Sequence, residues 1–135
     1  MIRDWTPEDA AFVRQVHFDS GFDYQLPAMN TPLYPIRRAG VEDGRSYIAA
    51  AVKVTAEVYL WLDHEWGTPQ ERLEALQELH ADVTEKARTL GFDQLYVCIP
   101  PEIAKSFGPR LRDLGWELAR PWPVYTFELR EKVYA

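Results

Sequence analysis

Apolar positions recur at steps of three and four in three stretches of the chain, and this spacing predicts three helices. They cover approximately residues 6–20, 68–90 and 102–115. The middle one has the clearest apolar stripe: Leu73, Leu76, Leu79, Val83, Ala87 and Leu90. Gly108-Pro109 interrupts the last one and predicts a kink or a restart there.

Stretches rich in β-branched and aromatic residues predict the strands. They lie at residues 2–5, 36–42, 46–54, 57–63, 93–99, 116–118 and 123–130. Asp43-Gly44 separates two of them and predicts a two-residue hairpin turn. Residues 20–35 hold three prolines without a clean period, which predicts a long loop.

The stretch 57–63 alternates so that Glu57, Tyr59 and Trp61 share one face. Val58, Leu60 and Leu62 share the other face. Both faces are largely apolar, and the stretch is therefore expected to be a central strand. The whole order of elements predicts an α/β (α+β) fold in a single domain, residues 1–135. Its core would be a mixed, mostly antiparallel central sheet of six to seven strands with helices on both faces.

Composition removes several function classes. The net charge is −6 and no basic cluster exceeds Arg37-Arg38, which argues against nucleic-acid binding. No apolar run approaches the length of a membrane span and no signal segment is seen, so a cytoplasmic protein is expected. The lone Cys98 fits a reducing compartment, and the three histidines lack metal-ligand spacing.

Two stretches, "VYLWLDHEW" (58–66) and "RLRDLGWEL" (110–118), add to the order of elements. Together they resemble the GNAT-type N-acetyltransferase superfamily over the whole chain. The resemblance implies acyl transfer from acetyl-CoA or another acyl-CoA to an amine acceptor. It places CoA binding on Leu62, Gly67, Gln70 and Arg72, where backbone amides and a helix N-terminus would hold the diphosphate.

The chain departs from the family pattern Gln/Arg-x-x-Gly-x-Gly/Ala at Gly67, Gln70 and Arg72. Thr68-Pro69-Gln70-Glu71 instead predicts a helix start that caps itself, as Thr6-Pro7-Glu8-Asp9 does on the first helix. Alternatively, the side chains of Gln70 and Arg72 replace the lost backbone donors. Leu111 stands where many members have the tyrosine that protonates the leaving thiolate.

The resemblance also suggests acceptor chemistry. Glu57 would be the base, and Phe22, Asp23, Tyr24 and Tyr34 of the long loop, with Tyr59, would line the acceptor pocket. The alternatives are that Glu57 marks an exposed turn and that the aromatic residues fix the loop to the core.

Two functions remain open at this point. The chain is an acyl-CoA-dependent N-acyltransferase acting on a small-molecule amine, or a catalytically degenerate module that binds a small molecule or a protein without using CoA. In either case the alternating stretch 123–133 could form an edge strand that pairs in a homodimer.

Overall fold

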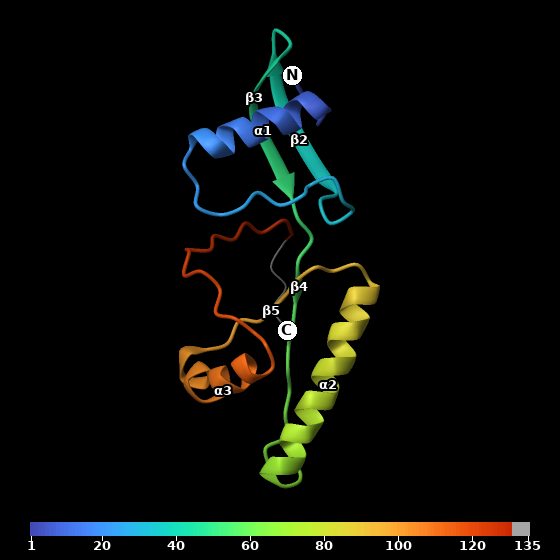
Figure 1. Ribbon diagram of the computed structural model, residues 1–135, viewed down its shortest axis with the longest axis vertical. Helices are drawn as coiled ribbons and strands as arrows, with labels where there is room; N and C mark the ends of the chain where they lie inside the picture. The colour runs from blue at the N-terminus through green and yellow to red at the C-terminus, as the bar shows by residue number, and fades with distance from the viewer. Residues whose placement is uncertain (131–135) are drawn as a thin grey trace. The chain divides into compact units, whose positions relative to one another are not determined.

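The computed structural model describes residues 1–130 (Figure 1). The chain forms two compact units, Met1–Cys98 and Ile99–Ala135. Within the described residues the first unit holds five strands and two helices, and the second holds one helix.

An antiparallel sheet forms the N-terminal part of the first unit. Its strands are β1 (Ile2–Asp4), β2 (Ile36–Glu42) and β3 (Arg45–Val52), in the order β1-β2-β3. The φ angles of Asp43 and Gly44 are 51° and 74°. Two positive φ angles in a two-residue connection define a type I′ turn, which matches the right-handed twist of the strands. The predicted hairpin is therefore confirmed.

A bulge interrupts the pairing of β2 with β3. Gly40 lies opposite Ile48 and Val41 lies opposite Ser46, so Tyr47 is the extra residue. A Cβ atom on Gly40 would lie 2.6 Å from Ile48 Cγ2 and 2.8 Å from Tyr47 Cζ. Glycine at this position therefore lets the two side chains close over the backbone of β2.

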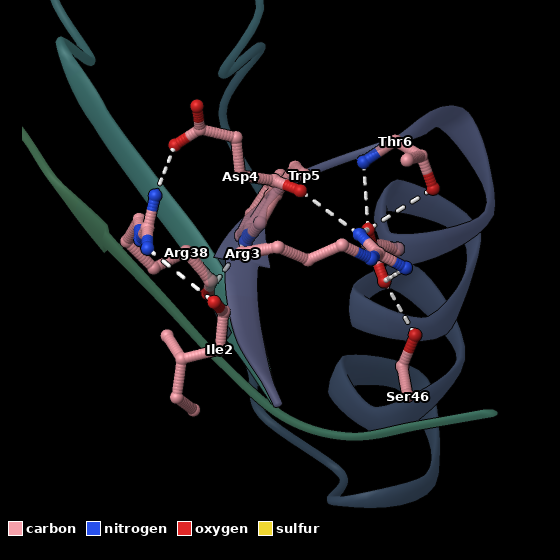
Figure 2. Close-up of polar contacts among 8 residues, drawn as sticks. Ile2, Arg3, Asp4, Trp5, Thr6, Arg38 and Ser46 are labelled. Carbon is pink, nitrogen blue, oxygen red and sulfur yellow. Dashed lines mark hydrogen bonds and ion pairs between the residues drawn. The ribbon is translucent and has the colours of Figure 1, made fainter. Parts of the chain in front are cut away.

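Helix α1 (Pro7–Asp19) is fixed to the sheet through the buried carboxylate of Asp9 (Figure 2). Arg3 of β1 donates from Nη1 to Asp9 Oδ2 at 2.5 Å, and Ser46 of β3 donates from Oγ to Asp9 Oδ1 at 2.5 Å. The Thr6 amide and hydroxyl donate to Oδ2 at 2.6 and 3.0 Å. One carboxylate thus joins the helix start to two strands.

The electrostatics of Asp9 follow from these donors. The Arg3 hydrogen bond, and then those of Ser46 and the Thr6 amide, hold the pKa of the Asp9 carboxyl well below its ordinary value. Burial acts in the opposite direction and is outweighed. The carboxylate therefore stays ionised although no surface of it reaches solvent.

The buried apolar core of the described residues is small and lies on β2 and the loop before it. Tyr34, Ala39 and Val41 are buried. The apolar stripe of α2 (Pro69–Thr89) contains no buried residue, and Leu79 and Leu90 are exposed. The predicted helix is confirmed, with Gly91 following its end at a φ of 88°.

The remaining strands are short. β4 (Ala56–Glu57) pairs in parallel with β5 (Leu95–Tyr96), and the Val58 amide continues the pairing by donating to the Tyr96 carbonyl at 2.9 Å. β5 falls inside the stretch predicted at 93–99, whereas β4 shares only Glu57 with the stretch predicted at 57–63, and each strand has only two residues.

The second unit contains α3 (Pro101–Asp113), with Pro109 inside it. The predicted restart at Gly108-Pro109 is wrong, because helical residues continue on both sides of the proline. Pro109 has no N–H, so the Lys105 carbonyl one turn earlier lacks its helical donor.

A central sheet of six to seven strands is wrong for the described part of the chain. Residues 1–130 form a three-stranded antiparallel sheet and a separate two-stranded parallel pair. The expected strands at 116–118 and 123–130 have no strand partner there, and residues 131–133 of the proposed edge strand lie outside the described residues. Alternation identified stretches suited to strands, but strands form only where a neighbour supplies hydrogen bonds.

Candidate functional site

The N-terminus of α2, where the resemblance places CoA, is closed by its own residues. The Glu71 amide donates to Thr68 Oγ1 at 3.1 Å, and the Thr68 amide donates to Glu71 Oε1 at 3.1 Å. Pro69 has no amide hydrogen to offer. The predicted self-capping helix start is therefore confirmed.

The two side chains that could have replaced the missing backbone donors have other partners. Arg72 donates from Nη1 to the carbonyls of Trp66 and Gly67, both at 2.8 Å. Gln70 donates from Nε2 to Glu74 Oε1 at 3.0 Å. Gly67 has a φ of 63°, which places its carbonyl in the turn that Arg72 binds. Leu62 lies on the exposed segment before this turn.

The predicted acceptor-pocket residues belong to three different sets of contacts. The rings of Phe22 and Tyr24 lie 5.4 Å apart between centroids and are tilted by 31°. His17 near the end of α1 lies 5.3 Å from Phe22 and 4.7 Å from Tyr24 between ring centroids. His17 Nε2 is 2.9 Å from the Tyr24 carbonyl oxygen.

Asp23, between Phe22 and Tyr24 in sequence, is exposed. Tyr34 is buried in the small core, where its amide donates to the Thr31 carbonyl at 3.0 Å. For Tyr34, the alternative that an aromatic residue fixes the loop to the core describes the structure.

Glu57, Tyr59 and Trp61 are all exposed, and together they are named here the acidic aromatic face. The rings of Tyr59 and Trp61 stack at 6.1 Å between centroids with 18° between their planes. Their exposed fractions are 65% and 84%. Tyr59 stacks on Trp61 and interacts with Glu57, so the predicted common face of these three residues is confirmed, although only Glu57 of them lies in a regular strand.

The carboxylate of Glu57 takes part in this face through Tyr59. The hydrogen bond from the Tyr59 hydroxyl to Glu57, together with the negative charge of Glu57, raises the pKa of Tyr59 above its ordinary value. Tyr59 therefore stays neutral at physiological pH, and its hydroxyl donates a hydrogen bond to the carboxylate. Glu57 is exposed, and its remaining lone pairs face solvent.

Tyr96 and Cys98 approach the same face from the neighbouring segment. Tyr96 lies opposite Glu57 in the parallel pair. After Glu57 and burial, Tyr96 and Cys98 make smaller electrostatic contributions that also raise the pKa of Tyr59. Sequence reasoning assigned neither residue to the site, although the strand predicted at 93–99 contains both. The missing information was which strand lies beside 57–63.

Residues 1–130 contain no group of three or more histidine, cysteine, aspartate or glutamate side chains placed to hold a metal ion. Within the same residues, no helix combines the length and apolar content that crossing a bilayer requires.

Comparison with protein-family models, curated proteins and solved structures gives no match to this chain. The resemblance to the GNAT superfamily therefore stays a prediction from sequence. The fold that the resemblance implied is the part that the sheets contradict.

Proposed function

We propose that the acidic aromatic face binds the cationic group of a ligand, an ammonium or a guanidinium, and that the chain is a binding module that does not use CoA. The observation that carries the proposal is the exposed, stacked pair of Tyr59 and Trp61 beside the Glu57 carboxylate. Large aromatic residues with this exposure commonly mark a surface that a partner covers.

The chemistry of the face selects a cation. The ring faces of Trp and Tyr carry negative electrostatic potential and attract ammonium and guanidinium groups. Glu57 adds a full negative charge next to the rings, and the net charge of −6 favours the approach of cations over anions. An anionic ligand would be repelled by the carboxylate, and a purely apolar ligand would gain nothing from its charge.

The N-terminus of α2 is the reason why the proposed function does not include CoA. A diphosphate at the helix start would need amide donors, and the capping box occupies those of Thr68 and Glu71. It would also meet the Glu71 carboxylate at the positive end of the helix. Without a site for the acyl-CoA, the hypothesis that Glu57 is the base of an acyl transfer has less support than the hypothesis that it binds an amine.

Calorimetric titration tests the proposal with two ligands of nearly equal size, Nα-acetyl-lysine methylamide and its norleucine analogue, which lacks the ammonium. Exposed cation–π and ion-pair contacts predict roughly five- to thirtyfold tighter binding of the lysine compound. Equal binding of the two ligands would contradict the proposal. Acetyl-CoA, titrated separately, is expected to give no saturable heat, and saturable binding would restore the acyltransferase hypothesis.

Two matched variants locate the binding. Trp61→Leu removes one ring of the stack and is expected to abolish the preference for lysine over norleucine. Leu60→Ala changes the neighbouring residue, whose side chain points to the opposite side of the segment, and is expected to keep it. Circular dichroism of both variants establishes that they fold alike.

A further inference from the structure

We infer that the ligand of the acidic aromatic face is an extended basic peptide, which adds as a strand along the outer edge of residues 57–61. This inference rests on the proposed function and names the class of ligand. It is carried by the backbone of this segment, which the binding of a lone cation would leave unused.

The backbone of residues 59–62 has no hydrogen-bond partner among the described residues. The pairing with β5 ends when the Val58 amide donates to the Tyr96 carbonyl. The chain then continues past β4, without regular secondary structure, towards the start of α2 (Figure 1). No other hydrogen bond within residues 1–130 uses the amides or carbonyls of this stretch.

The direction of the unpaired groups follows from the pairing with β5. In a parallel pair of strands, every second residue directs its N–H and C=O towards the neighbouring strand. The residues between them direct these groups away from that strand. Val58 bonds towards β5, so the backbone groups of Tyr59 point away from it. If the backbone stays extended to residue 61, the N–H and C=O of Trp61 also point away from β5. This is the edge geometry to which an extended peptide adds.

The side chains on this edge select a basic peptide. Alternate residues of an added strand project to the same face, with a rise of about 3.3 Å per residue. Lysine or arginine at alternate positions would therefore meet Tyr59 and Trp61 in turn, with Glu57 at one end. Asp63 and Glu65 follow the segment and extend the negative charge beyond its other end. Backbone bonds would supply affinity, and the aromatic rings would supply selectivity for cations.

The test uses the peptide Ac-Ala-Lys-Ala-Lys-Ala-Lys-Ala-NH2 and two trimethylated derivatives of it, which are isomers of each other. One isomer is N-methylated at the lysines, and the other is N-methylated at three alanines. Methylation removes the N–H, and alternate residues of a strand donate to opposite sides. Only one isomer therefore loses the bonds to the protein. We expect that isomer to bind at least about tenfold more weakly than the unmodified peptide, and the other to bind within about twofold of it.

The controls separate the two proposals. The unmodified peptide is expected to bind more tightly than Nα-acetyl-lysine methylamide, and the peptide with glutamate in place of lysine is expected not to bind. If the lysine derivative binds but the two methylated isomers bind equally, strand addition is refuted and the proposed function stands. If neither the lysine derivative nor the peptide binds, both are refuted.

Discussion

The hydrogen bond from Ser46 to the buried Asp9 carboxylate gives the sharpest stability prediction. Ser46→Ala removes one donor at 2.5 Å and leaves the charge of Asp9 and its bond to Arg3 in place. A hydrogen bond to a charged group contributes about 1.5–3 kcal/mol. Ser46 is only half-buried, so water can partly replace its hydroxyl, and we expect a loss near the lower end, about 1.5 kcal/mol.

Asp9→Asn is expected to cost more than Ser46→Ala, because it removes the charge that pairs with Arg3 as well as weakening the bonds from Ser46 and Thr6. The two losses should not add. In the Asp9→Asn background, Ser46→Ala should cost clearly less than in the wild type, because the two residues share one interaction.

Urea titration followed by the amide NMR signals of β2 and β3 measures these losses in the sheet itself. If Ser46→Ala changes the free energy of unfolding by less than about 0.5 kcal/mol, the claim that this carboxylate fixes α1 to the sheet is refuted. Strict additivity of the two substitutions would refute it as well.

The same carboxylate predicts a pH dependence whose sign is fixed. Its pKa is lowered in the folded state, so its contribution to stability is present above the unfolded value of about 3.9. That contribution is lost as the pH falls below this value towards the low folded pKa. The difference in unfolding free energy between wild type and Asp9→Asn should therefore be constant above about pH 5 and shrink below pH 4. A difference that does not change between pH 5 and pH 2.5 would contradict the assignment.

Three further substitutions test the local structure. Gly40→Ala should lower the free energy of unfolding by about 1–3 kcal/mol in urea titrations, because its Cβ would lie 2.6 Å from Ile48 Cγ2; a neutral result would contradict the bulge geometry. Thr68→Ala should cost about 1 kcal/mol and reduce helical circular dichroism at 222 nm, whereas unchanged ellipticity would mean that the cap is not formed. Pro109→Ala should stabilise α3 by up to about 3 kcal/mol and slow its amide exchange, and faster exchange would count against an uninterrupted helix.

Local signals in the sequence were sufficient where a few neighbouring residues determine the structure. Asp43-Gly44 predicted the hairpin because only residues that tolerate positive φ make a type I′ turn. Thr68 and Glu71 predicted the start of α2 because a capping box needs only residues three apart. These features depend on no distant part of the chain.

The predicted sheet was wrong because the sequence of one strand does not determine which other strand it pairs with. Alternation over 57–63 placed Glu57, Tyr59 and Trp61 on one face correctly, and it also suggested a central strand. Only Ala56 and Glu57 have strand partners in β5. The approach of Tyr96 and Cys98 to Tyr59 depends on this pairing, and the sequence contains no local signal for it. The ion pair of Arg3 with Asp9 was missed for the same reason, since it depends on where β1 meets α1.

The central claim is that Tyr59, Trp61 and Glu57 bind a cation. The most direct measurement follows the indole N–H signals of the five tryptophans by NMR while Nα-acetyl-lysine methylamide is added, with the norleucine analogue as the control. The account predicts a saturable shift of the Trp61 signal with the lysine compound, a much weaker response to the norleucine compound, and loss of the lysine response in Glu57→Gln. A Trp61 signal that stays unmoved, or moves equally with both compounds, would contradict it.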